Sequence, residues 1–123
     1  MEGEIGSLVW LIPDAYLPPI GDSNLPSHES TCILNLNKKP AKVKFTFYFE
    51  DKDPIESKEI EVSAERTWHV RLDYAEEILG VKLERDVPFA IKVESNIKIV
   101  VQHSRLDTRQ ANLAYMTSMA YSG

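Results

Sequence analysis

The sequence predicts an all-β fold, a two-sheet antiparallel β-sandwich with one short helix. Roughly seven or eight short segments show the alternation and the β-branched and aromatic content of strands, and turn residues separate them at fairly regular spacing. The sequence shows no crossover helices between these segments, which excludes a Rossmann or other parallel α/β fold. Its 123 residues are enough for one core and too few for two, so we expect a single domain over residues 1–123.

The first two predicted strands flank a long irregular segment. Residues 7–12 form an apolar run, which predicts the first strand. Residues 31–37 predict the second, and the alternation of their side chains places Ile33 and Asn35 on the same face. Residues 14–30, which lie between them, are rich in proline, and loops of this length are usually functional or disordered.

Three more strands are predicted in the middle of the chain. Residues 42–50 form the clearest one, and the side chains expected in the core are Val43, Phe45, Phe47 and Phe49. After a turn at residues 51–54, residues 57–62 and 66–72 predict two further strands of a meander. The core set expected in the last of these is Trp68, Val70 and Leu72.

One short helix is predicted over residues 74–79. Asp73 is followed three residues later by Glu76, which resembles a capping box at the start of a helix. Gly80 lies where the C-terminal cap would fall.

The last third of the chain predicts a hairpin and a final strand. Residues 87–94 and 97–103 are separated by Ser95 and Asn96, a two-residue connection that suits a tight turn because Asn tolerates a positive φ. These two strands should pair with each other. The tail over residues 111–121 predicts a strand, although its alanine and methionine content also suits a helix.

The composition argues against several functional classes. The net charge of −5 argues against a nucleic-acid binder. No apolar run approaches the roughly 20 residues that cross a bilayer. Cys32 is the only cysteine, which excludes an intramolecular disulfide, and Glu2 and Glu4 stand where a signal peptide would carry positive charge. We therefore expect a soluble protein in a reducing, cytoplasmic setting.

The most informative stretch covers residues 100–110, where an apolar run ends in alternating ionisable side chains. In an extended chain the side chains on one face are His103, Arg105, Asp107 and Arg109. Arginine presents a planar fork suited to carboxylates, phosphates or sugar hydroxyls, so we predict a site for an anionic or polar ligand. The alternative is a network at a subunit contact, in which Asp107 pairs with Arg105 or Arg109 and Asp73 pairs with Arg71.

A metal-dependent enzyme is a further alternative, built on the three histidines His28, His69 and His103. No pair of them has a diagnostic spacing such as HxH or HExxH, and each histidine can instead bond to a buried carbonyl or a neighbouring subunit. Cys32 is flanked by apolar residues, which indicates a buried, inert thiol. The sequence has neither a GxSxG elbow nor a phosphate-binding loop. We therefore expect no enzyme, no bound metal and no cofactor.

Aromatic side chains raise the alternative of a sugar-binding module. Trp10, Tyr16, Tyr48 and Trp68 are candidates for a platform on which a sugar ring stacks. Large aromatic residues in a small sandwich are nevertheless more often part of the core.

Three segments together resemble the sensory rhodopsin transducer family. They are SHESTCILN at residues 27–35, RTWHVR at residues 66–71 and IVVQHSRLDTRQ at residues 99–110. The AYLPP loop at residues 15–19 and the closing MAY at residues 119–121 also fit, so the resemblance covers nearly the whole chain. The positions that match the family's signature are His28, Glu29, Asn35, His69, Arg71, Gln102, His103, Arg105, Asp107 and Arg109.

The resemblance implies a small β-sandwich that forms a homotetramer, is soluble and cytoplasmic, and binds partners without catalysing a reaction. Since the family is named for the soluble partner of a cyanobacterial sensory rhodopsin, a protein partner such as a membrane receptor is expected. Sandwiches of this kind also look like carbohydrate-binding modules, which implies a small polar ligand such as a sugar. The signature positions are expected to form a shared ligand-binding pocket or a subunit seam.

Overall fold

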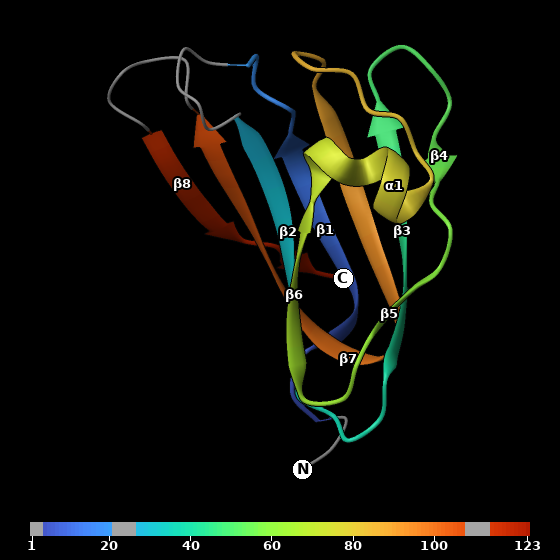
Figure 1. Cartoon of the computed structure of the whole chain (residues 1–123). Helices are drawn as coiled ribbons and strands as arrows, with labels where there is room; N and C mark the ends of the chain where they lie inside the picture. The colour runs from blue at the N-terminus through green and yellow to red at the C-terminus, as the bar shows by residue number, and fades with distance from the viewer. Residues whose placement is uncertain (1–3, 21–26, 108–113) are drawn as a thin grey trace.

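The computed structural model describes residues 4–20, 27–107 and 114–123, and its secondary structure is almost entirely β (Figure 1). In chain order the strands are β1 (Ser7–Ala15), β2 (His28–Asn35), β3 (Ala41–Phe49), β4 (Ile55–Glu56), β5 (Ile60–Val62), β6 (Arg66–Arg71), β7 (Phe89–Asp107), β8 (Ala114–Met119) and β9 (Tyr121–Ser122). A 3-10 turn, Leu72–Tyr74, leads into helix α1 (Ala75–Leu79). The predicted all-β sandwich with one short helix is confirmed.

Two antiparallel sheets share the long strand β7 (Figure 1). In the first sheet the order is β4-β3-β7-β1-β9, and β5 also pairs with β3. The second sheet has the order β6-β2-β7-β8. β7 pairs with β3 through residues 89–95 and with β2 through residues 100–106, so one strand passes from the first sheet into the second. The polar end of β7 therefore belongs to the second sheet.

The predicted hairpin at Ser95 and Asn96 is wrong, because β7 continues through both residues as one strand. Neither residue has the positive φ that a tight hairpin turn needs. Their side chains accept backbone hydrogen bonds instead, from the N–H of Lys42 to Asn96 Oδ1 at 2.8 Å and from the N–H of Ile97 to Ser95 Oγ at 3.3 Å. Both halves of β7 find partners on other strands, and this pairing overrides the local preference for a turn.

The core between the sheets follows the predicted alternation on β3. Val43, Phe45 and Phe47 are fully buried, and Phe49 is half-buried. Phe89 of β7 contacts Phe47 edge to face, with ring centroids 5.7 Å apart. The inward set predicted for residues 42–50 is thus confirmed.

The segment between the first two strands is shorter than predicted, because β1 and β2 take up part of it. Leu17 forms an isolated bridge with Arg85. The NH1 group of Arg85 donates to the carbonyl of Pro18 at 2.7 Å and to that of Ser27 at 2.9 Å. These contacts hold the chain that follows β1 beside the start of β2. Residues 21–26 lie outside the described residues.

The C-terminal cap of the helix is as predicted, whereas its N-terminal cap is not. Gly80 has a left-handed backbone with φ of 72°, and its N–H donates to the carbonyl of Glu76 at 3.2 Å, so the C-terminal cap is confirmed. The capping box is not formed, because the Asp73 carboxylate bonds to Arg71. No described helix is both long enough and apolar enough to cross a membrane.

Two other predicted strands are partly changed. Of the segment predicted at residues 57–62 only Ile60–Val62 is a strand, β5, while β4 lies just before the segment. Between them the N–H of Ser57 donates to the carbonyl of Phe45 at 2.8 Å, whereas that of Lys58 turns to the carbonyl of Leu79 at 3.0 Å. The tail is a strand over the described residues of β8, whereas residues 111–113 lie outside them.

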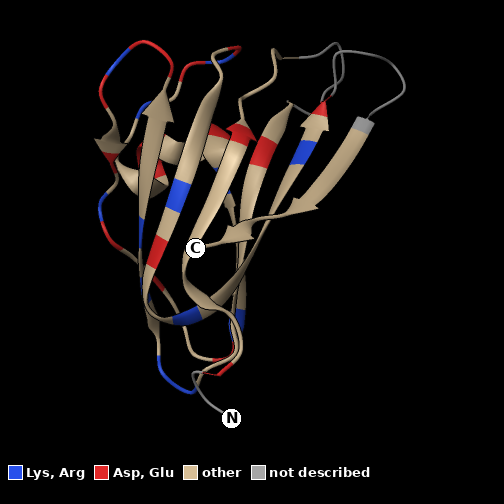
Figure 2. Cartoon of the chain, turned by 180° about the vertical axis from the view of Figure 1, so that it is seen from behind, with Lys and Arg blue, Asp and Glu red and all other residues tan. Residues whose placement is uncertain are grey.

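Charged residues of both signs are interspersed along the strands and loops (Figure 2). The net charge of the chain is −5. Nucleic-acid binders usually gather lysine and arginine on one face. The mixed pattern of the face shown in Figure 2 differs from that arrangement.

Candidate functional site

Strand alternation divides the predicted site residues between the two faces of the second sheet. The side chains that point inward, between the sheets, are Glu29, His103 and Arg105. The side chains on the outer face are His28, His69, Arg71 and Gln102. Asn35 ends β2, Asp107 ends β7, and Arg109 lies outside the described residues. The structure therefore brings these residues together as two groups on opposite faces.

Asn35 has a structural role at the far end of β2. Its side chain is fully buried, and Nδ2 donates to the carbonyls of Lys39 at 2.8 Å and Val62 at 3.1 Å. Its Oδ1 accepts from the N–H of Asn37 at 3.0 Å. The amide thus satisfies backbone groups of the turn after β2 and of the end of β5, and it takes no part in the inward group.

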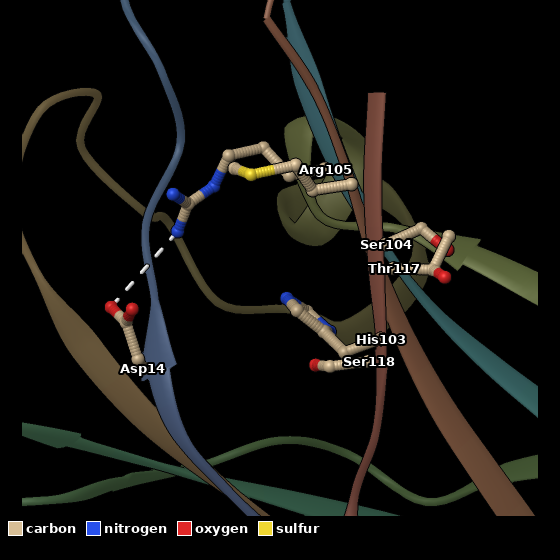
Figure 3. A pocket seen from close by; sticks show the side chains of 7 residues that line it. Asp14, His103, Ser104, Arg105, Thr117 and Ser118 are labelled. Carbon is tan, nitrogen blue, oxygen red and sulfur yellow. Dashed lines mark ion pairs between the residues drawn. The ribbon is translucent and has the colours of Figure 1, made fainter. Parts of the chain in front are cut away.

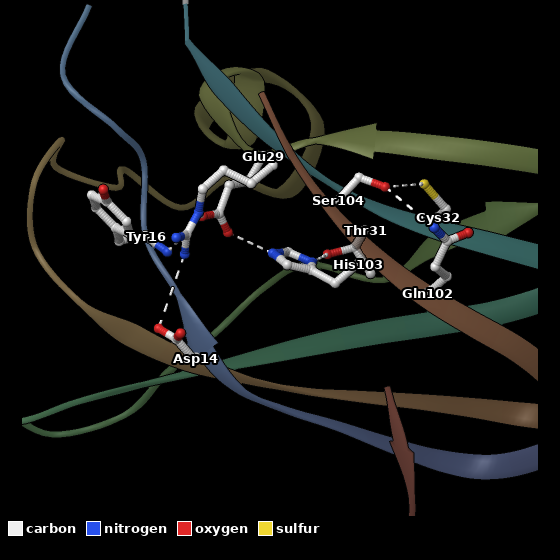
Figure 4. Close-up of polar contacts among 9 residues, drawn as sticks. Asp14, Tyr16, Glu29, Thr31, Cys32, Gln102, His103 and Ser104 are labelled. Atoms are coloured by element: carbon white, nitrogen blue, oxygen red, sulfur yellow. Dashed lines mark hydrogen bonds and ion pairs between the residues drawn. The ribbon is translucent and has the colours of Figure 1, made fainter. Parts of the chain in front are cut away.

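The inward group is centred on the carboxylate of Glu29, which is fully buried (Figure 4). Oε1 lies 2.5 Å from Nε2 of His103. Oε2 accepts from Nε of Arg105 and from the backbone N–H of Tyr16 at 3.1 Å. A buried carboxylate is tolerated only when it is paired and hydrogen-bonded, and these contacts meet that condition.

Both ring nitrogens of His103 are engaged. Nε2 faces the Glu29 carboxylate, and Nδ1 lies 3.2 Å from the hydroxyl of Thr31. With the proton on Nε2, the ring donates to Glu29 and accepts from Thr31 through Nδ1. The order of hydroxyl, imidazole and carboxylate matches that of a hydrolase triad, but Thr31 is fully buried. A hydroxyl out of reach of any substrate does not act as a nucleophile.

Beside this group a cleft of about 210 Å³ opens between the end of β1 and strand β8 (Figure 3). Asp14 lies on one side of it, and the other side is formed by β7 and β8. The lining side chains from these two strands include His103, Arg105, Met116 and Ser118. The inward group therefore borders a space that a small molecule can enter.

Arg105 connects the buried carboxylate to the cleft. Its Nε bonds to Glu29, and its Cζ lies 4.3 Å from the ring centroid of Tyr16. NH2 is 4.0 Å from Oδ1 of Asp14, whose side chain is 88 % exposed. The guanidinium is thus fixed in orientation, while its terminal nitrogens make only this loose ion pair among the described residues.

The sequence analysis did not identify the acidic partners of Arg105. The acidic partners of Arg105 are Glu29 and Asp14, neither of which the sequence analysis named as such. The alternative that Asp107 pairs with Arg109 involves a residue outside those described. Asp14 was assigned to an irregular segment, and Ser118 to a tail of ambiguous structure. Only the pairing of β8 with β7 places Ser118 opposite His103. No sequence signal identifies that neighbour.

The outer group surrounds a second hollow, of about 200 Å³. Arg71 lines this hollow from the end of β6. Its Nε and NH2 donate to the two carboxylate oxygens of Asp73 at 3.0 and 2.6 Å, as the sequence predicted, and this pairing raises the pKa of the guanidinium. His28 and His69 line the same hollow from β2 and β6.

Cys32 also lines this hollow and is half-buried, where the sequence predicted a buried thiol. Burial raises its pKa, and a contact of 4.0 Å with the hydroxyl of Ser104 partly offsets that effect. A raised pKa leaves little thiolate at neutral pH, so the thiol is a poor nucleophile.

The three histidines do not converge. His103 points between the sheets, whereas His28 and His69 line the hollow on the outer face. Within residues 4–20, 27–107 and 114–123, no group of three or more His, Cys, Asp or Glu side chains is arranged to bind a metal ion. A metal site that uses all three histidines is therefore incompatible with this arrangement.

The comparison with protein families decides the assignment. A family model described as Anabaena sensory rhodopsin transducer matches residues 5–122. The chain belongs to this family. The match spans both sheets, so the resemblance read from the sequence segments is confirmed. None of the curated proteins matches the chain.

Two solved structures are similar to this member of the transducer family over most of their length. The crystal structure of Thermotoga maritima 1070 has a TM-score of 0.86 and 36 % identity, and the match covers 97 % of both chains. The Anabaena sensory rhodopsin transducer has a TM-score of 0.74 and 42 % identity, covering 87 % of this chain and 94 % of that one. The fold is thus shared with a protein named as a signal transducer.

Proposed function

We propose that this member of the transducer family is a non-enzymatic signal-transduction protein that binds a protein partner or a small polar ligand at the cleft beside Arg105. Family membership supports the signalling role. The observation that carries the binding role is the guanidinium of Arg105, oriented by Glu29 and Tyr16 and directed toward an open cleft. Pre-organised polar groups at the edge of a cleft reduce the entropic cost of binding.

The chemistry of the cleft favours a neutral, hydroxyl-rich ligand such as a sugar. Arg105 offers donors, and Asp14 offers an acceptor 4.0 Å away. A pair of neighbouring hydroxyl groups can accept from the first and donate to the second. A multiply charged anion fits less well, because Glu29 and Asp14 together carry more charge than Arg105 balances.

The proposed partners follow from the family. A protein partner in this role is a membrane receptor of the rhodopsin kind, met from the cytoplasm by a homotetramer of this chain. Four exposed side chains on β8 and β9 support a protein contact, and they are Tyr115, Met116, Met119 and Tyr121. Among the described strands β8 pairs only with β7, so its other edge has no strand beside it. A strand edge of this kind, next to exposed apolar side chains, commonly marks a contact surface.

The predicted site residues remain part of this proposal as two groups. The group beside the cleft comprises Glu29, His103 and Arg105. The outer side comprises His28, His69, Arg71 and Gln102. We make no proposal for a metal-dependent enzyme, because the histidines lie on opposite faces.

A thermal-shift titration with a panel of monosaccharides and polyols tests the cleft. A ligand that binds only the native state raises Tm by mass action, and we expect this shift to be lost in Arg105→Lys, which keeps the charge but not the planar fork. Arg66→Lys is the matched control, since Arg66 is exposed at the far end of β6. A panel without any shift, or an equal shift in Arg105→Lys, would contradict the cleft. Light scattering on the same samples tests the tetramer.

A further inference from the structure

The outer hollow lies on the opposite face of the sheet from the cleft, and the function proposed above assigns it no ligand of its own. Its floor consists of the small side chains Ser30, Cys32 and Ser104. Larger side chains surround them, and they are His28, His69, Arg71, Leu106 and Tyr115. The register explains the shape, because Ser30 of β2 stands directly opposite both Arg71 of β6 and Ser104 of β7.

Two polar groups at this hollow lack a hydrogen-bond partner among the residues that the structure describes. Ser30 is 8 % exposed, and its hydroxyl, which borders the hollow, is one of them. The other is NH1 of Arg71, since Asp73 occupies only Nε and NH2 of the guanidinium. The Arg71 side chain is 30 % exposed, and Ser30 lines the same hollow, so both donors are accessible to ligand oxygens there.

The hydrogen-bond donors around the hollow favour an oxyanion. Arg71 and the imidazoles of His28 and His69 line it, and none of its described lining residues carries a carboxylate. Asp73 faces Arg71 from the 3-10 turn with a side chain only 7 % exposed, so it orients the guanidinium and balances its unit charge, and the hollow attracts an oxyanion through its hydrogen-bond donors. The ring of Tyr74, 4.9 Å from Cζ of Arg71, restrains the guanidinium from another side. This arrangement leaves one edge of the fork directed at a ligand.

We propose that the outer hollow binds a small molecule through its phosphate or carboxylate group. NH1 of Arg71 and the hydroxyl of Ser30 donate to the oxyanion, and His69 adds a third donor from β6. The hollow, of about 200 Å³, is small enough to suit an oxyanion with a short carbon skeleton. Leu106 and Tyr115 form the apolar wall that the skeleton contacts.

Amide chemical shifts of the ¹⁵N-labelled protein, followed during separate titrations with inorganic phosphate and with acetate, test this site. We expect saturable changes at Ser30, Arg71 and Ser104. Arg71→Gln should weaken binding about tenfold or more, because it removes the charged donor of a hydrogen bond to the oxyanion. Ser30→Ala removes only a hydroxyl and should weaken binding by roughly two- to tenfold. Arg66→Gln removes a charge from the same strand outside the hollow and should leave the affinity unchanged.

The outcomes separate the possibilities. A response to phosphate alone assigns a phosphate-bearing ligand, a response to acetate alone assigns a carboxylate, and either result supports the hollow. Equal affinities in wild type, Arg71→Gln and Ser30→Ala would overturn the proposal, and so would a hollow that stays unresponsive because a second copy covers it. The cleft variant Arg105→Lys should bind phosphate like wild type. Failure of this site is thereby distinguished from failure of the proposed function.

Discussion

The buried carboxylate of Glu29 should be essential for the stability of the second sheet. The perturbation we choose is Glu29→Gln, which keeps the shape of the side chain and removes its charge. In the structure this carboxylate is fully buried and contacts His103, Arg105 and the backbone of Tyr16. The substitution leaves Arg105, which is only 18 % exposed, without the charge that compensates it.

The magnitude follows from these contacts. Removing one partner of a buried ion pair costs about 3–5 kcal/mol. Arg105 retains some solvent access and the loose ion pair with Asp14, so we expect about 3 kcal/mol, at the low end of that range. For a chain of this size that loss corresponds to a fall in Tm of roughly 10 °C.

Urea unfolding of wild type, Glu29→Gln and the exposed control Glu56→Gln provides the assay. The control should lie within about 0.5 kcal/mol of wild type, because Glu56 is exposed on the short edge strand β4. A double-mutant cycle with Arg105→Gln should show coupling of about 1 kcal/mol or more, since the two side chains act as one unit. If Glu29→Gln proved as stable as Glu56→Gln, our assignment of Glu29 as a buried, paired carboxylate would be wrong.

Three further predictions concern other parts of the fold. Gly6→Ala should destabilise the protein by about 2 kcal/mol or more in urea unfolding, because Gly6 has φ of 98° and an added Cβ would lie 2.2 Å from the carbonyl oxygen of Ile99. Asn35→Ala should cost about 2–3 kcal/mol by the same assay, because it leaves buried backbone groups of the turn after β2 without partners. Alkylation of Cys32 by iodoacetamide near pH 8 should be slower than that of a free thiol and should accelerate on unfolding, because its raised pKa reduces the thiolate fraction.

Each of these predictions has a simple contrary result. Normal stability of Gly6→Ala would mean that the chain just before β1 does not approach β7 so closely. Asn35→Ala with wild-type stability would mean that water replaces the amide in the turn. A rate of alkylation equal to that of a free thiol in the native protein would show that Cys32 is neither buried nor shifted in pKa.

Much of the fold was predictable, because alternation is a local property. The inward set of β3 follows from strict alternation of large apolar and polar side chains, and burial confirms it. Gly80 ends the helix because only glycine adopts a left-handed backbone there at little cost. Ser95 and Asn96 misled the prediction, because their composition is typical of a turn although both halves of β7 pair with other strands. Long-range pairing outweighs a local preference of this size.

The sequence by itself determined which side chains share a face. His103 and Arg105 alternate along one strand, so they had to point the same way. Only the tertiary structure decided what they meet, because the register of β2 against β7 sets Glu29 opposite Arg105 and the fold of the chain after β1 brings Asp14 and Tyr16 to it. The physical reason is that periodicity is fixed within a strand, whereas the register between strands depends on the packing of the whole core.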